Sequence, residues 1–209
     1  MIHLEAIEAV LLDMDGTLVD SDASVERSWA AWAHEYGVDP AQVLAVAHGS
    51  PSILTVRRFL PGRDEASLAA SARRQLELQY DDLSDVGPTP GAHLLVDTLR
   101  RHGLRWAVVT SADRRLARAR PGAAGIDPPV LVTFEDVRAG KPDPESYHVA
   151  ARRVSVDASR CLVVEDSEPG LAAGRAAGMR TAALRGLDGD LRLGDLTELV
   201  RLLDGRAKR

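Results

Sequence analysis

Six polar side chains of this sequence follow short apolar runs, and their types suit the chemistry of a bound metal ion. They are Asp13 and Asp15 after residues 9–12, Thr110 and Ser111 after residues 106–109, and Glu165 and Asp166 after residues 161–164. Carboxylates that gather at one place need a cation, and a ligand set made only of oxygens suits magnesium. If the three groups meet, the sequence therefore predicts a magnesium site with a pair of hydroxyl groups beside it.

A single lysine adds a positive charge to this set. Lys141 lies among turn-forming residues in the segment 139–144, where it could hold a phosphate oxygen and offset developing negative charge. Each group also has a simpler explanation when taken alone. A loop lysine is usually exposed, Thr110 and Ser111 could cap the helix expected from Asp113, and the acids near Glu165 could begin a helix.

The elements that must position these residues alternate between strands and helices. Short runs rich in Val and Leu are each followed by polar residues and then by a helical pattern, which predicts a mostly parallel sheet covered on both faces. Ligands bind at the carboxyl ends of such strands, so the polar groups should meet at one edge of the sheet. The expected strands are residues 9–12, 106–109, 130–132, 161–164 and 181–184.

An all-helical insertion is expected after the first strand. Turn-forming residues at 85–91 would return the chain to the sheet, so we predict a core domain of residues 1–18 and 85–209 and an inserted domain of residues 19–84. The aromatic residues of the first helix recur at helical spacing, which favours packing inside the insertion, with one of them facing the site as the alternative. The expected helices are 24–36, 40–47, 50–60 and 64–80, and the aromatic residues are Trp29, Trp32 and Tyr36.

Composition narrows the classes of protein that the chain can be. Of its 209 residues, 45% are hydrophobic, which is enough for a packed core. A net charge of −5 argues against binding to nucleic-acid backbones, and Cys161, the only cysteine, excludes a disulfide framework and a multi-cysteine zinc site. The first apolar run is too short for a signal peptide or a membrane span, so a cytoplasmic protein is expected.

Four segments resemble the motifs of the haloacid dehalogenase superfamily, in the right order. The segment Asp13–Leu18 is similar to its DxDGT signature, and Thr110-Ser111, Lys141 and Glu165-Asp166-Ser167 are similar to its other three motifs. The resemblance covers nearly the whole chain, because the helical insertion resembles the cap domain that this superfamily places between its first two motifs. It implies an α/β fold with a Rossmann-like parallel sheet core and an inserted all-helical cap domain.

The resemblance also implies a role for each motif residue. Asp13 would attack phosphorus to form an aspartyl-phosphate, and Asp15 would protonate the leaving alcohol and later deprotonate the hydrolytic water. The ligands of Mg²⁺ would be Asp13, the backbone carbonyl of Asp15, Asp166 and Glu165, the last directly or through water. Thr110, Ser111 and Lys141 would hold the phosphoryl oxygens.

The loop between two helices of the insertion bears on specificity. His48-Gly49 resembles the substrate loop of the sugar-phosphatase branch, which includes 2-deoxyglucose-6-phosphatases and glycerol-3-phosphatases. That branch usually continues with a basic residue and an Asp-Thr pair, whereas this chain continues from Ser50 to Thr55 without them. We expect His48, Gly49, Ser50 and Arg57 to contact the substrate, with Arg57 or Arg58 supplying the missing charge.

The expected function is therefore magnesium-dependent hydrolysis of a small sugar or polyol phosphate through an aspartyl-phosphate. A phosphosugar mutase resembling beta-phosphoglucomutase is the alternative, because it shares the nucleophile, the acid/base aspartate and the cap topology. A dehalogenase is disfavoured, since that chemistry needs neither magnesium nor Asp15. The expected partner is a small-molecule phosphate ester, with no nucleic acid and no membrane, bound by a monomer or a weak dimer.

Overall fold

The computed structural model describes residues 4–47, 50–80 and 82–206, and these residues contain a six-stranded parallel sheet. Its strand order is β5-β4-β1-β6-β7-β8, which confirms the predicted α/β class. The strands are β1 (Ala9–Leu12), β4 (Arg105–Val109), β5 (Leu131–Val132), β6 (Cys161–Glu165), β7 (Arg180–Ala183) and β8 (Leu191–Arg192). Because β1 pairs with β4 on one side and β6 on the other, the residues that follow these three strands emerge side by side.

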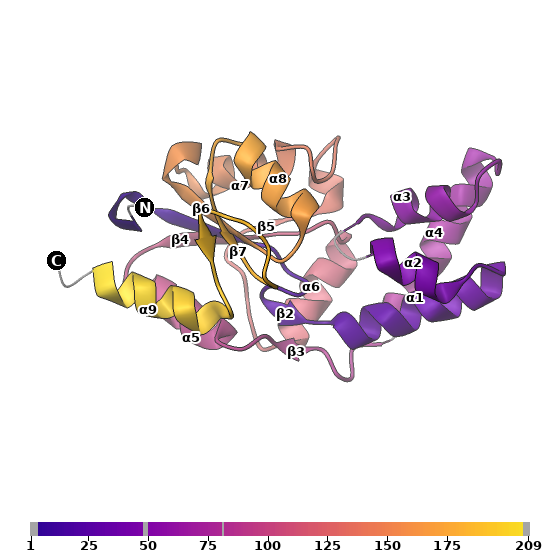
Figure 1. Cartoon of the computed structure of the whole chain (residues 1–209), viewed down its shortest axis with the longest axis horizontal. Helices are drawn as coiled ribbons and strands as arrows, with labels where there is room; N and C mark the ends of the chain where they lie inside the picture. The colour runs from indigo at the N-terminus through magenta and orange to yellow at the C-terminus, as the bar shows by residue number, and fades with distance from the viewer. Residues whose placement is uncertain (1–3, 48–49, 81, 207–209) are drawn as a thin grey trace.

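Helices cover both faces of the sheet, as Figure 1 shows. All four residues of β1 are buried, and alternate residues pack on opposite faces. Val10 and Leu12 lie in the hydrophobic cluster that includes residues of α5, α6 and α9, while Ala9 and Leu11 lie with residues of α7 and α8. These helices are α5 (Ala92–Arg101), α6 (Arg114–Ala123), α7 (Glu145–Val154), α8 (Glu168–Ala176) and α9 (Leu196–Arg206).

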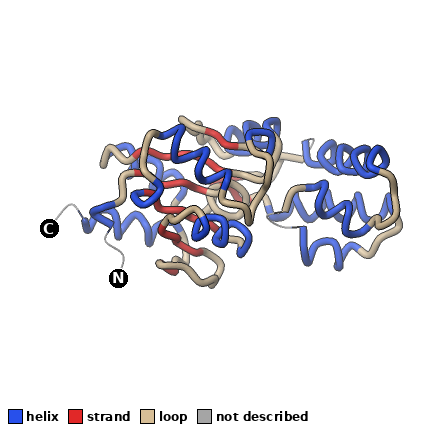
Figure 2. The backbone as a smooth tube through the Cα atoms, turned by 90° about the horizontal axis from the view of Figure 1, so that it is seen from above, coloured by secondary structure: helices blue, strands red, loops and turns tan. Residues whose placement is uncertain are grey.

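Four further helices form a separate layer beyond the sheet edge, which we call the helical lobe; Figure 2 shows it as a group of helices without strands. The lobe has its own hydrophobic cluster, in which Trp32 is fully buried and its indole N–H donates to the backbone carbonyl and hydroxyl of Ser71. Trp29 packs edge-on against Trp32, and Tyr36 stacks on it. The helices are α1 (Asp22–Tyr36), α2 (Pro40–Ala47), α3 (Ser52–Phe59) and α4 (Glu65–Tyr80).

The chain leaves the sheet and returns to it at neighbouring points. Strand β2 (Val19–Asp20) precedes the helical lobe, strand β3 (Gly87–Pro88) follows it, and the two pair in an antiparallel ladder. Beside this ladder the hydroxyl of Thr89 donates to the carbonyl of Thr17 at 2.6 Å. The two segments that connect the helical lobe to the core are therefore hydrogen-bonded to each other.

Local differences from the sequence prediction have identifiable causes. Strand β8 was not predicted, because it has only two residues and the segment around it has no apolar run. The proposed cap of α6 was wrong: Asp113, not Thr110 or Ser111, accepts the backbone N–H of Leu116 at 2.9 Å. Thr110 and Ser111 therefore do not cap α6. No helix among the described ranges is long and apolar enough to cross a membrane.

Candidate active site

A cavity of about 210 Å³ lies between the carboxyl ends of the strands and the helical lobe. Its floor includes Asp13, Asp15 and Asp166 from the loops after β1 and β6, and Thr110 and Ser111 from the loop after β4. Its upper wall comes from α1, from the α2–α3 connection and from α4. The parallel pairing of β1 with β4 and β6 therefore brings the three polar groups of the sequence together, beneath a wall formed by the lobe.

A buried lysine holds two carboxylates at the base of the site. The ammonium of Lys141 donates to Oδ1 of Asp13 at 2.5 Å, to Oε1 of Glu165 at 2.6 Å and to the carbonyl of Val109 at 2.9 Å. Lys141 is 6% exposed and Glu165 fully buried, so the interaction is little screened by water. The lysine was expected in a solvent-exposed loop if it had no function, and the structure contradicts that reading.

The crowding of charges shifts the pKa values of this cluster. Burial, followed by the Glu165 carboxylate, raises the pKa of Asp13 well above its ordinary value, and Lys141 opposes the rise. Burial, again with Glu165, raises the pKa of Asp166 to about 6. Burial lowers the pKa of Lys141, but the negative charges of Asp13 and Glu165 outweigh this and raise it overall. Two positive charges, Lys141 and Arg185, therefore face the three acids Asp13, Glu165 and Asp166, which leaves a net negative charge that a further cation would neutralise.

The carboxylate of Glu165 has a second set of hydrogen-bond donors and packs closely against Gly170. The hydroxyl of Tyr147 donates to Oε1 at 2.8 Å, and the hydroxyl of Ser167 donates to Oε2 at 2.9 Å. Gly170, in the first turn of α8, leaves room for this carboxylate because it has no side chain. A Cβ added there would lie 1.8 Å from Oε1 of Glu165. Any side chain at position 170 must displace the group that orients Lys141.

Gly170→Ala is therefore expected to cost activity as well as stability. The methyl group cannot share the space of Glu165, and overpacking of this kind costs about 1–3 kcal/mol, more than the gain of about 1 kcal/mol in helix propensity. Gly205→Ala is the matched control, since nothing lies within 4 Å of a Cβ at that position in α9. Urea unfolding should show destabilisation for Gly170→Ala and slight stabilisation for Gly205→Ala. Equal effects on the two variants would contradict the close packing of Gly170 against Glu165.

The acidic cluster meets the requirements of a magnesium site. Oxygens of Asp13, Glu165 and Asp166 lie within 4.8 Å of one another, and an all-oxygen set suits a hard divalent cation. Thr17 orients Asp166 by donating to Oδ1 at 3.2 Å. Gly16, with φ of 77°, lets the backbone approach, because a Cβ there would lie 2.1 Å from Oδ2 of Asp166. The residues present therefore fit a bound magnesium ion.

The loop after β4 offers groups for an anion. The hydroxyl of Ser111 is buried and has no hydrogen-bond partner among the described residues, which is costly unless a ligand supplies one. Thr110 is 4% exposed and its hydroxyl accepts the backbone N–H of Ala112 at 3.0 Å. Lys141 adjoins these residues, because its ammonium donates to the carbonyl of Val109, the residue before Thr110.

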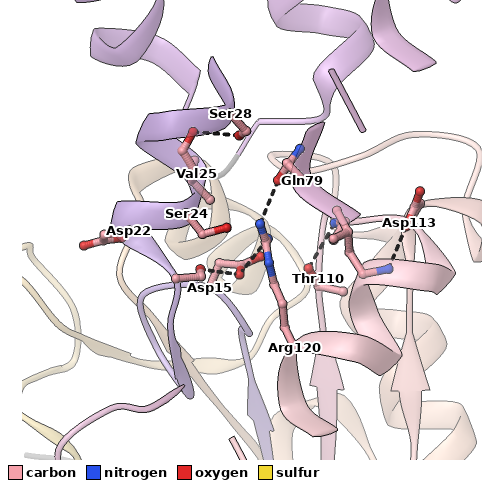
Figure 3. Close-up of polar contacts among 12 residues, drawn as sticks. Asp15, Asp22, Ser24, Val25, Ser28, Gln79, Thr110, Asp113 and Arg120 are labelled. Carbon is pink, nitrogen blue, oxygen red and sulfur yellow. Dashed lines mark hydrogen bonds and ion pairs between the residues drawn. The ribbon is translucent and has the colours of Figure 1, made fainter. Parts of the chain in front are cut away.

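Asp15 lies on the other side of the cavity floor, beside two residues that the sequence analysis missed. Its Oδ1 accepts hydrogen bonds from Ser21 at 2.6 Å and from the guanidinium of Arg120 at 2.8 Å. Figure 3 shows Arg120 reaching from α6 between Asp15 and Gln79 of the helical lobe. A second arginine, Arg185, contacts Asp166 at 2.9 Å. Sequence reasoning had no signal for either arginine, since neither belongs to a motif and many other arginines are scattered along the chain.

The expected substrate contacts divide into three cases. Ser50 lines the cavity, and so does Trp29, one of the aromatic residues for which a position facing the site was the alternative. Arg57 does not line it: the half-exposed guanidinium binds Glu65 at 2.8 Å on the surface of the lobe. The described residues that line the cavity therefore do not include Arg57, and its contact with a substrate stays a prediction. His48 and Gly49 lie outside the described residues.

The comparisons with known proteins agree with this geometry. The family model described as haloacid dehalogenase-like hydrolase matches residues 7–178. Hexitol phosphatase A of Escherichia coli is 38% identical over 195 residues, covering 93% of this chain and 90% of that protein. The 2-deoxyglucose-6-phosphate phosphatase 1 of Saccharomyces cerevisiae is 32% identical over 192 residues, covering 83% of this chain and 78% of that protein.

A solved structure shares the fold at lower identity. The beta-phosphoglucomutase from Clostridium difficile superposes with a TM-score of 0.80 at 17% identity, covering 97% of this chain and all of that chain. The same arrangement of sheet and helical lobe is thus found in a mutase, and the fold alone does not separate hydrolysis from transfer.

Proposed function

Because the chain belongs to the haloacid dehalogenase-like hydrolase family and is a phosphoric monoester hydrolase, we propose that it hydrolyses the phosphate ester of a small sugar or polyol. The observation that carries this proposal is Lys141, which holds Asp13 at 2.5 Å beneath a small cavity closed by helices. The identities with a hexitol phosphatase and a 2-deoxyglucose-6-phosphate phosphatase support the substrate class.

The proposed mechanism uses Asp13 and Asp15 in turn. A carboxylate oxygen of Asp13 attacks phosphorus, the bond to the leaving oxygen breaks, and Asp15 gives that oxygen its proton. Water then attacks the aspartyl-phosphate, Asp15 takes the proton of the water, and phosphate leaves with Asp13 regenerated. Thr110, Ser111 and Lys141 hold the phosphoryl oxygens through both steps.

Magnesium is proposed as the cofactor of this reaction. Asp13, Asp166 and the backbone carbonyl of Asp15 would hold it, with Glu165 acting directly or through water. When bound, the ion would offset the negative charge of the transferring phosphoryl group. Lys141 would act beside the ion, since it is already engaged with both Asp13 and Glu165 at the base of the site.

Residues 19–84 are proposed to act as a cap that closes over the substrate and excludes water from the first step. The cavity of about 210 Å³ suits a small ester rather than a macromolecule. Its wall on the lobe side combines apolar side chains with hydroxyl and amide groups, a mixture that suits the carbon skeleton and hydroxyl groups of a polyol. The residues concerned are Val25, Trp29, Ile53, Leu76, Ser50, Ser52 and Gln79.

The charges around the cavity favour hydrolysis over a mutase reaction. A mutase must hold a bisphosphate, which has a second dianionic group far from the nucleophile. Among the described residues lining the cavity, the cationic side chains are Arg120 and Arg185, and each is bound to a carboxylate. The structure as described therefore offers no uncommitted cation for a second phosphate group.

Phosphate release from a panel of sugar phosphates, glycerol phosphates and nucleotides tests the proposal. With magnesium, release is expected from sugar or polyol phosphates and not from nucleotides. EDTA should lower it by more than about 100-fold, since a bound metal supplies several kcal/mol of transition-state stabilisation. Release that persists in EDTA would refute the metal requirement, and an inactive enzyme across the panel would refute phosphatase activity. Formation of an isomeric sugar phosphate with a bisphosphate activator, without free phosphate, would favour the mutase.

A further inference from the structure

Arg120 is a buried arginine whose position is unusual for a helix otherwise rich in exposed charges. It is 2% exposed, it lines the cavity, and its two terminal nitrogens point to different parts of the molecule. One donates to Oδ1 of Asp15 at 2.8 Å and the other to Oε1 of Gln79 at 2.7 Å. Figure 3 shows this bridge between the sheet core and the helical lobe.

Keeping a guanidinium at this place is costly. Burial of a charge is unfavourable unless hydrogen bonds and an opposite charge compensate it, and the Nε of Arg120 has no partner among the described residues. An apolar side chain would fill the same space without that cost. The bridge to Asp15 therefore calls for an explanation beyond packing.

The contacts select one oxygen of Asp15. Both hydrogen bonds given for its side chain, from Arg120 and Ser21, go to Oδ1. Two donors fixed on Oδ1 set the rotation of the carboxyl group and leave Oδ2 to face the reacting groups. A proton carried on Oδ2 would then be directed at the leaving oxygen.

The second nitrogen of Arg120 connects this arrangement to the lobe. Gln79 donates to Oε1 of Gln75 at 2.6 Å, and the same oxygen accepts the hydroxyl of Ser52 at 2.6 Å. Ser52 begins α3 and itself lines the cavity. A continuous chain of hydrogen bonds thus runs from the substrate-facing wall of the lobe to the carboxyl group of Asp15.

We propose that Arg120 is a positioning residue for Asp15, and that Gln79 makes this positioning depend on the placement of the helical lobe over the core. The inference rests on the proposed function, in which Asp15 is the acid and base. When the lobe seats Gln79 against Arg120, Oδ2 of Asp15 gives its proton to the leaving oxygen as the bond between phosphorus and that oxygen breaks. When the lobe moves away, the guanidinium loses its hydrogen bond to Gln79, and Asp15 is less well aligned with the leaving oxygen.

A series of aryl phosphates of nearly equal size, from phenyl to p-nitrophenyl phosphate, tests this role. Nitrophenolate leaves readily without a proton, whereas phenolate needs one, so poor alignment of the acid should harm phenyl phosphate most. For Arg120→Met, kcat/KM is expected to fall about 100-fold for phenyl phosphate but only about tenfold for p-nitrophenyl phosphate. The ratio kcat/KM reports the first phosphoryl transfer, and therefore excludes the hydrolysis step that all the esters share.

Three companion variants make the result decisive. Arg120→Lys keeps the charge and should recover part of the kcat/KM for phenyl phosphate. Gln79→Leu should also lower kcat/KM more for phenyl phosphate than for p-nitrophenyl phosphate, but by a smaller factor than Arg120→Met. Arg74→Met is the matched control, because Arg74 pairs with Glu35 on the surface of the lobe and is not among the residues that line the cavity. It should leave kcat/KM unchanged for every ester. If Arg120→Met does not fold, Arg120→Lys and Gln79→Leu carry the test.

The outcomes separate the two levels of inference. An equal loss for every ester in the Arg120 and Gln79 variants, with an active wild type, would overturn the positioning role and leave the proposed function standing. A wild type that hydrolyses none of the esters, nor any sugar phosphate, would instead overturn the proposed function itself. A loss that grows as the leaving group becomes more basic supports the proposal.

Discussion

Replacing Asp13 with asparagine is expected to lower kcat for a sugar phosphate by more than about 10⁴-fold, as loss of a nucleophile does elsewhere. The amide has nearly the shape of the carboxylate but cannot form the aspartyl-phosphate. The fold should survive, because Asp13 is crowded by Glu165 and a neutral group relieves that repulsion. Phosphate release and urea unfolding, measured on the same preparations, give the two quantities.

Two results would contradict this expectation. Substantial activity in Asp13→Asn, with mass spectrometry excluding reversion to aspartate, would remove Asp13 from the role of nucleophile. A collapse of stability together with activity would make the loss structural instead. Asp97→Asn is the control, because Asp97 is exposed and pairs with Arg100 on the same helix; it should change neither quantity.

Replacing Lys141 with methionine is expected to damage stability and activity together. Removing one member of a buried charged pair costs about 3–5 kcal/mol, because the acids left behind remain buried without their counter-charge. Loss of the positive charge that holds Asp13 should also lower kcat by about 10²–10³-fold. Urea unfolding and phosphate release measure the two effects.

Two further variants distinguish the charge from its geometry. Only two of the 26 basic residues are lysines, yet one of them stands here, where a compact ammonium donates to three acceptors. The planar guanidinium of Lys141→Arg cannot reproduce that arrangement, so it should not restore activity. Adding Glu165→Gln to Lys141→Met should recover part of the stability but none of the activity. Full activity in Lys141→Arg would show that charge alone suffices.

The centre of the site could be predicted because strand ends are encoded locally. Asp13, Thr110 and Asp166 each follow an apolar run, and the parallel sheet then places them together whatever the rest of the chain does. Asp15 and Glu165 are found by the same reasoning. Lys141 follows no apolar run, and only its resemblance to a motif separated it from an ordinary loop lysine.

The residues around that centre could not be predicted, for physical reasons. Arg120 lies in a helix with several other arginines, and only the packing of α6 decides which of them is buried; its partner Asp15 is 105 positions away. Arg57 shows the same difficulty, since a helix with two adjacent arginines does not reveal which of them faces the cavity; the structure pairs Arg57 with Glu65. The close packing of Gly170 against the carboxylate of Glu165 is visible only once the fold places the two residues in contact.

The ladder between β2 and β3 has a consequence for how such a chain can change over time. Because Val19 pairs with Pro88 and Asp20 with Gly87, the whole helical lobe is attached to the core like one long hairpin loop. Lengthening such a loop adds little entropy cost, about 0.6 kcal/mol for each doubling of its length. The lobe also has a hydrophobic cluster of its own. An exchange of the lobe for another helical module would therefore leave the sheet core and the buried cluster of Asp13, Lys141 and Glu165 intact, so that new specificities can arise by replacement of a part.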